Sequence, residues 1–135
     1  MTEEVRPVMS DAEREVLKVL WEHGPLAVRD VASRLAEVGQ AWSRSTVITL
    51  LQRLEKKAYV ASDKSRFAFI FRAVVSREEV MRSRMNDLAG ELCDGEALPL
   101  VLAFAERHHF SQAELTRFRQ MIDELEAKRG KRGSR

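Results

Sequence analysis

WSRSTVITLLQRL, residues 42–54, is the stretch that decides the fold of this chain, because as a helix it has two contrasting faces. At about 100° per residue, one stripe spaced i, i+3, i+4, i+7 is apolar, whereas the other side carries hydroxyl, amide and cationic groups without a carboxylate. Such a face can lie against phosphates and reach the edges of bases. The apolar stripe is Val47, Leu50, Leu51 and Leu54, and the polar side is Ser45, Thr49 and Gln52 flanked by Arg44, Thr46 and Arg53.

Two amphipathic helices are expected before this segment. The capping-box pattern Ser10-Asp11-Ala12-Glu13 opens the first, and Gly24-Pro25 ends it. The second ends near Gly39. Apolar residues recur at helical spacing in both, and we expect these residues to form the core: Val16, Leu17, Leu20 and Trp21 in the first, and Val28, Val31, Ala32 and Leu35 in the second.

The sequence period changes from helix to strand after Lys57. The runs 59–62 and 66–74 are rich in β-branched and aromatic residues, and the second run alternates with a period of two. Asp63-Lys64-Ser65 suits a turn between them. Three helices followed by a hairpin predict a winged helix-turn-helix, with Lys64 and Arg66 near the tip of the wing.

The remainder of the chain is predicted to be helical. Capping-box patterns begin at Ser76 and Ser111, and Pro99 suits the first turn of a helix between them. The apolar stripe of the last helix is too long for one short neighbouring helix to cover, so we expect a second chain to cover it. The residues predicted to dimerise are Leu100, Val101, Phe104, Leu115, Phe118, Met121, Ile122 and Leu125.

These elements predict a mainly α fold with a small β-wing, divided into three parts. Residues 1–75 form an N-terminal winged helix-turn-helix that binds DNA, residues 76–128 form a helical dimerisation arm, and residues 129–135 form a basic flexible tail.

The charge of the chain is unevenly placed. The net charge is only +2, but seven Lys or Arg and two acidic residues lie between positions 39 and 75, which is a local charge of +5. The last eight residues, KRGKRGSR, add another +5, so the rest of the chain is acidic. A basic middle between acidic flanks indicates a polyanionic partner.

The sequence indicates a cytoplasmic protein without membrane insertion. It has no run of about 18 apolar residues and no basic-then-apolar N-terminus of the signal-peptide type. Cys93 is the only cysteine and cannot form an intrachain disulfide, which fits a reducing compartment.

Taken together, the ordered segments resemble the BlaI/MecI penicillinase-repressor family of bacterial transcription regulators. The similarity covers roughly residues 8 to 127 and is carried by MSDAEREVLKVLWEHGPLAVRDV (9–31), TVITLLQRLEKKAYV (46–60), RFAFIFRAVVSREE (66–79) and LVLAFAERHHFSQAELTRFRQMIDEL (100–125). The resemblance implies a homodimeric repressor whose winged helix binds a pseudo-palindromic operator in double-stranded DNA.

The resemblance also implies which residues contact DNA. By position, the contacts of the family fall on residues 42–49; relatives often have Lys at Ser45 and a polar residue at Ile48, so the half-site of this chain is expected to differ from theirs. Lys64 and Arg66 would contact phosphates from the wing. The residues predicted to bind DNA are Trp42, Ser43, Arg44, Ser45, Thr46, Ile48, Thr49, Gln52, Arg53, Lys64 and Arg66.

Two branches of the family use their arms as sensors, and this chain departs from both. In the penicillinase branch, a membrane sensor protease triggers cleavage between an Asn and a Phe, and the matching pair here is Ala103-Phe104, which lacks the Asn. In the copper-sensing branch, Cys-x-Cys pairs bind the metal, and the sequence has none. No metal or other cofactor is therefore predicted.

Alternatives remain open at this stage. The same winged helix would serve in a protein–protein adaptor, or in a regulator whose arm binds a small ligand, whereas no catalytic constellation indicates an enzyme. Trp42 is either a hydrophobic anchor or a phosphate contact, and His108-His109 is either a metal-ligand pair or a solvated helix end. Cys93 is either inert or redox-sensitive, and the basic tail either is solvated or attracts phosphates.

Overall fold

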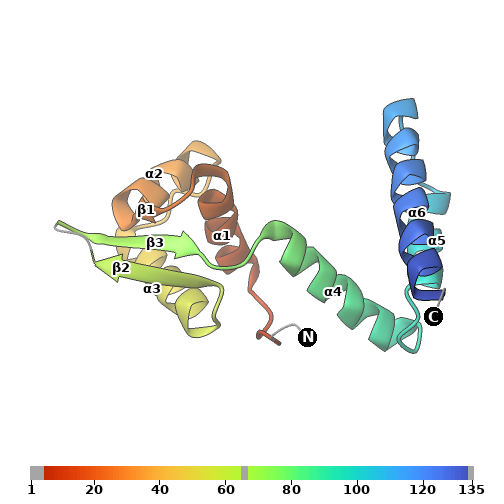
Figure 1. Ribbon diagram of the computed structural model, residues 1–135. Helices are drawn as coiled ribbons and strands as arrows, with labels where there is room; N and C mark the ends of the chain where they lie inside the picture. Colours follow the sequence, from red (N-terminus) through yellow and green to blue (C-terminus); the bar gives the residue numbers. More distant parts are fainter. Residues whose placement is uncertain (1–4, 65–66, 134–135) are drawn as a thin grey trace. The chain divides into compact units, whose positions relative to one another are not determined.

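Six helices and three short strands form the part of the chain that the structure, a computed structural model, describes, namely residues 5–64 and 67–133 (Figure 1). The predicted class, mainly α with a small β-wing, is confirmed. In chain order the elements are α1 (Asp11–His23), β1 (Leu26–Ala27), α2 (Val28–Glu37), α3 (Arg44–Lys56), β2 (Val60–Lys64), β3 (Phe69–Ala73), α4 (Arg77–Leu92), α5 (Leu98–Glu106) and α6 (Gln112–Gly133).

Local signals in the sequence determine both ends of α1. The Ser10 hydroxyl accepts a hydrogen bond from the Glu13 N–H at 3.1 Å, and the Glu13 carboxylate accepts one from the Ser10 N–H at 2.7 Å. At the other end, Gly24 has a φ of 77°, a left-handed conformation that costs glycine little. The predicted capping box and stop signal are both confirmed.

The inner faces of α1, α2 and α3 form one hydrophobic core, to which the sheet adds Val60 and Phe71. Trp21 packs against the edge of this core, and its indole N–H donates to the Val75 carbonyl at 2.9 Å. Of the core positions predicted from helical spacing, Trp21, Val28 and Ala32 are partly buried and pack against the core. The others are buried: Val16, Leu17, Leu20, Val31, Leu35, Val47, Leu50, Leu51 and Leu54.

The wing is a three-stranded antiparallel sheet in the order β1-β3-β2, and not the two-stranded hairpin that the sequence predicts. The additional strand, β1, pairs Leu26 with Phe71 and Ala27 with Ile70. It has only two residues, too few to show an alternating pattern, so nothing local distinguishes it from the turn that precedes α2.

The predicted position of the turn in the wing is wrong. Asp63 and Lys64 belong to β2, where they pair with Ile70 and Phe69 of β3. The Asp63 carboxylate accepts a hydrogen bond from the Arg72 guanidinium on the facing strand at 3.1 Å, which favours continued pairing. β3 also begins at Phe69, three residues after the predicted start of the strand.

The three predicted C-terminal helices are present as α4, α5 and α6. The Ser76 hydroxyl accepts a hydrogen bond from the Glu79 N–H at 3.0 Å at the start of α4, and Ser111 and Glu114 form a reciprocal capping box at the start of α6. None of the described helices is both long and apolar enough to cross a membrane.

The chain divides into two compact units, Met1–Leu88 and Ala89–Arg135, and each is treated by itself. The functional boundary that the sequence predicts between residues 75 and 76 stays a prediction. The structure groups the first part of α4 with the winged helix because Val80 packs against its core. α6 continues to Gly133, so it includes residues that the sequence assigns to the tail. This segment can be helical because Lys and Arg favour helix and the single glycine within it, Gly130, lowers helix stability only modestly.

Candidate nucleic-acid interface

α3 presents the two faces that its sequence predicts. Val47, Leu51 and Leu54 are fully buried and Leu50 is 5% exposed, which fixes the rotation of the helix about its axis. The other side is in solvent and carries no carboxylate before Glu55. We define this exposed face of α3 as Arg44, Ser45, Thr46, Ile48, Thr49, Gln52 and Arg53.

A group of hydroxyls organises the start of α3. Ser43 is the N-cap residue, and its hydroxyl accepts a hydrogen bond from the Thr46 N–H at 3.2 Å. The same oxygen lies 3.0 Å from the Thr46 hydroxyl and 3.1 Å from the Ser45 hydroxyl. A helix N-terminus with hydroxyls and an arginine around it is suited to an anion such as phosphate.

Thr49 has a defined hydrogen-bonding role on the exposed face of α3. Its hydroxyl donates to the Ser45 carbonyl, one turn earlier, at 3.0 Å. Since the hydroxyl hydrogen is used within the helix, the oxygen lone pairs remain available to accept a hydrogen bond from outside. In the major groove, the donors of this kind are the amino groups of cytosine and adenine.

Two of the basic residues that give the middle of the chain its charge are neutralised within the fold. The Lys57 ammonium lies 2.7 Å from the Glu13 carboxylate, and Arg72 is paired with Asp63. Among the residues that the structure describes, four others are exposed and form no ion pair: Arg44, Arg53, Lys56 and Lys64. Arg44 and Arg53 therefore make the exposed face of α3 basic, and Lys56 and Lys64 are exposed cations at the ends of α3 and β2.

The Glu13 side chain is 1% exposed and is paired with the Lys57 ammonium. Burial by itself raises the pKa of this carboxyl, but hydrogen bonds from Lys57 and Ser10 and the charge of Lys57 together lower the pKa below its ordinary value. Lys57 also donates to the Val8 carbonyl at 2.9 Å. Lys57 is therefore a structural cation that joins α1, the N-terminal segment and the end of α3.

The other predicted DNA-binding residues occupy different surroundings. Trp42 is half-buried and packs against the core, which favours the anchor interpretation. Ile48 is 37% exposed, and Lys64 is exposed at the end of β2. Arg66 lies outside the described residues, so its role stays a prediction.

Three residues that the sequence did not single out lie beside the exposed face of α3. Arg29 is in the first turn of α2, and Phe67 and Phe69 are on the wing; together with Arg44 and Ile48 they line a common groove. Sequence patterns identified the phenylalanines only as strand residues and gave no signal for Arg29, because the groove joins three separate elements.

The residues predicted to dimerise are mostly in contact with solvent in the single chain. Phe104 is 65% exposed and Leu125 57% exposed, and Leu100 is half-buried. This amount of clustered apolar surface is unusual for a protein that works as a monomer. The remaining predicted residues are also exposed: Val101, Leu115, Phe118, Met121 and Ile122.

His108 takes part in an aromatic cluster. Its ring stacks on Phe104 with 5.2 Å between centroids and lies 4.6 Å from the ring of Phe110, which in turn meets Phe118 edge-on at 5.0 Å. No group of three metal-binding side chains occurs in residues 5–64 and 67–133. Cys93 is half-buried at the end of α4, and its N–H donates to the Ala89 carbonyl.

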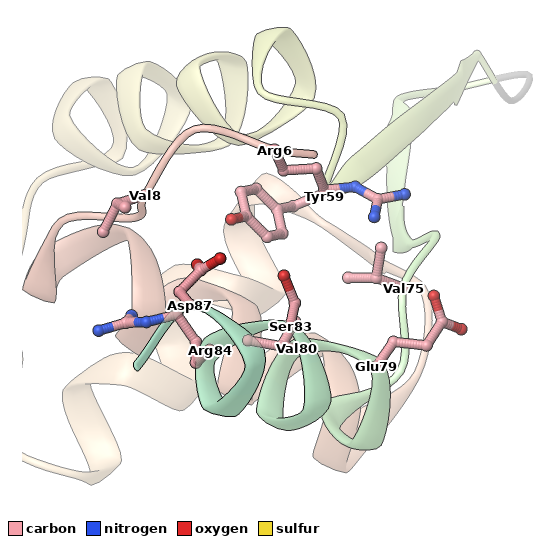
Figure 2. Close-up of a pocket in the computed structure, with 9 residues that line it drawn as sticks. All are labelled: Arg6, Val8, Tyr59, Val75, Glu79, Val80, Ser83, Arg84 and Asp87. Atoms are coloured by element: carbon pink, nitrogen blue, oxygen red, sulfur yellow. The ribbon is translucent and has the colours of Figure 1, made fainter. Parts of the chain in front are cut away.

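A small cavity lies between the N-terminal segment, Tyr59 and α4 (Figure 2). The Tyr59 hydroxyl donates to the Pro7 carbonyl at 2.7 Å, and burial raises the pKa of this phenol. Ser83 and Asp87 of α4 lie on the opposite side of the cavity (Figure 2). Its volume of about 30 Å³ is enough for a water molecule but not for a small-molecule effector.

Known proteins resemble this chain over most of its length. The penicillinase repressor of Bacillus licheniformis is 28% identical over 118 residues, covering 87% of this chain and 91% of the relative. The methicillin resistance regulatory protein MecI of Staphylococcus aureus (strain N315) is 24% identical over 115 residues, covering 85% of this chain and 93% of the relative.

Solved structures of a DNA-binding repressor also resemble it. The DNA-binding domain of the repressor BlaI in solution is 31% identical, with a TM-score of 0.49, and the match covers 57% of this chain and 93% of that one. Monomeric Bacillus licheniformis BlaI in complex with the blaP half-operator is 32% identical, with a TM-score of 0.47, covering 56% and 90%. The penicillinase repressor family profile matches residues 9–124. This chain, which has the winged helix and helical arm described above, therefore belongs to the penicillinase repressor family, a family of non-enzymatic transcriptional repressors.

Proposed function

We propose that this protein is a bacterial transcriptional repressor that binds operator DNA as a homodimer, with α3 in the major groove and the wing against the backbone. The observation that carries the proposal is the exposed face of α3, which has hydroxyl, amide and guanidinium groups and no carboxylate. Membership of the penicillinase repressor family supports it. Such a repressor works where the bacterial chromosome is, in the cytoplasm.

Each part of the exposed face of α3 has a distinct role in this proposal. Arg44 and Ser43, at the start of the helix, hold phosphates with the help of the helix dipole. Thr49 accepts a hydrogen bond from the amino group of a cytosine or an adenine, because its own hydrogen is donated to Ser45. Ile48 contacts the methyl group of a thymine. Ser45, Thr46, Gln52 and Arg53 complete the contacts on this side, while Trp42 anchors the start of the helix against the core. Lys64 and Arg66 contact phosphates from the wing.

The dimer is formed by residues 76–128. Burial of the exposed apolar residues of α5 and α6 against a second copy provides the driving force for association. Two copies related by a two-fold axis present two α3 helices, so the operator is a pseudo-palindrome whose half-sites match their separation.

Removal of the arm would relieve repression. Ala103 and Phe104 lie within α5, so a cut between them separates α6 and most of the predicted dimerisation residues from the DNA-binding part. A monomer binds a single half-site and loses the gain in affinity that a dimer obtains by binding two half-sites at once. A membrane sensor protease is the kind of partner that would trigger such a cut.

A selection experiment tests the proposed function. The purified full-length protein is incubated with a pool of random duplexes at several salt concentrations, and the bound DNA is sequenced. We expect recovery of an inverted repeat and an affinity that falls steeply with salt, by about one log unit per log unit of salt for each phosphate contact. Binding without sequence preference and with a flat response to salt would refute the proposal and favour a protein–protein adaptor.

A further inference from the structure

Residues 5–9, which we call the N-terminal strap, are held against the turn that joins α3 to β2. The Arg6 guanidinium donates to the Ala58 carbonyl at 2.8 Å, and the Pro7 carbonyl accepts a hydrogen bond from the Tyr59 hydroxyl at 2.7 Å. The Arg6 guanidinium also lies over the Tyr59 ring, 5.9 Å from its centroid. The strap therefore has a defined position, although it belongs to no helix or strand.

The N-terminal strap and Tyr59 form one side of the small cavity, and the start of α4 forms the other, with Ser83 and Asp87 pointing from α4 toward Tyr59 (Figure 2). The residues of α4 that line the cavity are Glu79 and a stripe spaced i, i+3, i+4, i+7, namely Val80, Ser83, Arg84 and Asp87. Val80 is the one apolar residue of this set, and none of residues 77–88 is buried. Because so few apolar contacts hold this part of α4, its direction depends on the polar groups beside it.

The stretch that leads into α4 is held at a second place. The Val74 N–H donates to the Tyr59 carbonyl at 2.9 Å, and the Trp21 indole N–H donates to the Val75 carbonyl at 2.9 Å. The Arg77 guanidinium lies 5.3 Å from the centroid of the Trp21 ring. α1 thus holds the beginning of α4, while the N-terminal strap and Tyr59 lie beside the next turns. Two supports at different points along a helix fix its direction, whereas a single support leaves the helix free to swing.

We propose that Tyr59 and the N-terminal strap set the direction in which α4 leaves the winged helix, and thereby the separation between half-sites that the dimer accepts. This inference rests on the proposed function, because only a dimer that binds an inverted repeat has a separation to set. Tyr59 is 6% exposed, so it is a positioning residue that acts through α4 and does not touch DNA. Arg6 has the same role through its contacts with Ala58 and Tyr59.

α4 is the element through which this direction affects the dimer. It belongs to the first compact unit as far as Leu88, and its residues 89–92 begin the second unit, which also contains α5 and α6. One base pair more or less between two half-sites moves one of them by about 3.4 Å along the duplex and turns it by about 35°. A dimer whose α4 helices have a fixed direction therefore accepts few spacings, and a dimer whose α4 helices swing accepts more.

Fluorescence anisotropy of the full-length protein tests the inference with a set of labelled duplexes. Each duplex carries an inverted repeat of the selected half-site, with the centre lengthened or shortened by one base pair at a time, and one further duplex carries a single half-site. Tyr59→Phe removes only the hydroxyl that donates to Pro7, and Arg6→Ala removes the contact with Ala58. Arg14→Ala is the matched control, because this arginine of α1 pairs with Asp11 and lies outside the cavity.

The wild type should prefer one spacing. In Tyr59→Phe and Arg6→Ala, the preference for that spacing over its neighbours should fall about fivefold, the factor expected for one hydrogen bond. The affinity for the single half-site should stay unchanged, because the exposed face of α3 is intact. Arg14→Ala should keep the spacing profile of the wild type.

The outcomes separate the inference from the proposed function. A wild-type preference for one spacing that survives in both variants would overturn the inference alone. An equal loss of affinity for every duplex, the single half-site included, would also overturn it, because the substitutions would then act on folding or on the DNA-binding face. Arg6→Ala keeps the test valid if Tyr59→Phe folds poorly, because Arg6 is only half-buried. If the wild type binds all spacings and the single half-site equally well, the proposed dimer fails and the inference fails with it.

Discussion

Replacing Lys57 by methionine should destabilise the winged-helix unit strongly, although this lysine lies in the basic segment that the sequence assigns to DNA binding. The Lys57 ammonium is 2.7 Å from a carboxylate oxygen of Glu13, whose side chain is 1% exposed, and it also holds the Val8 carbonyl. Without the lysine, the buried carboxylate loses its cationic partner and keeps hydrogen bonds from Ser10 alone among the described residues. Breaking a buried ion pair from one side costs about 3 kcal/mol or more, and the partial exposure of Lys57 places this pair near the lower end of that range.

Urea unfolding followed by tryptophan fluorescence measures this loss of stability, because Trp21 and Trp42 both pack against the core of the winged-helix unit. With a denaturant dependence of about 1–3 kcal/mol per molar urea, a loss of about 3 kcal/mol should lower the midpoint by about 1–3 M. Lys56→Met is the matched control, since this neighbouring lysine is exposed and forms no ion pair within the described residues. Equal midpoints for the two variants would refute the structural role of Lys57.

The pH dependence provides a second check on the same pair. The pKa of Glu13 is lowered from 4.5 in the folded protein, so its contribution to stability is fully present above pH 4.5 and is lost as the pH falls through the folded value. The difference in the free energy of unfolding between Lys57→Met and the wild type should therefore become smaller below pH 4.5. Glu13→Gln added to Lys57→Met should recover part of the stability at pH 7, because it replaces the unpaired buried charge with a neutral amide.

Three further substitutions test the proposed interface and the arm. Thr49→Ala should weaken operator binding by about 1 kcal/mol or more with an unchanged urea midpoint, and unchanged affinity for the selected operator would contradict the groove contact. Ile122→Asp should produce a monomer in sedimentation velocity, because it places a charge on the apolar surface of α6. A dimer of wild-type affinity would show that this surface is not the dimer interface. Arg66→Ala should flatten the salt dependence by about one unit for all sequences alike, and a loss confined to the operator would exclude a phosphate contact.

The helices could be predicted from the sequence because their signals are local. The buried stripe of α3 follows from the spacing of four apolar residues, and the caps at Ser10 and Ser111 follow from residues three positions apart. β1 could not be predicted, since its two residues are ordered by pairing with β3 more than forty positions later. The same holds for the end of β2, which continues because Asp63 meets Arg72 across the sheet.

The basic segment shows what a count of charged residues can predict and what it cannot. Lys57 and Arg44 are equivalent in a sum over the sequence, but Lys57 is paired with a carboxylate that lies 44 positions earlier in the chain. Only the packing of α1 against the end of α3 brings these two groups together. Arg29 is the reverse case, because it lies outside the basic segment and yet lines the same groove as Arg44.

The specificity of the proposed interface depends on details that family membership does not determine. Since the Thr49 hydroxyl is committed to the Ser45 carbonyl, it selects bases that offer a donor, and its neighbour Ile48 selects an apolar methyl group. A lysine at position 45 would instead select acceptors such as those of guanine. Short hydroxyls also make few contacts, so affinity has to come from elsewhere in the interface. Under the proposed function, phosphate contacts from Arg44 and Lys64 supply it, because such contacts hold the backbone of any sequence and leave the choice of bases to α3.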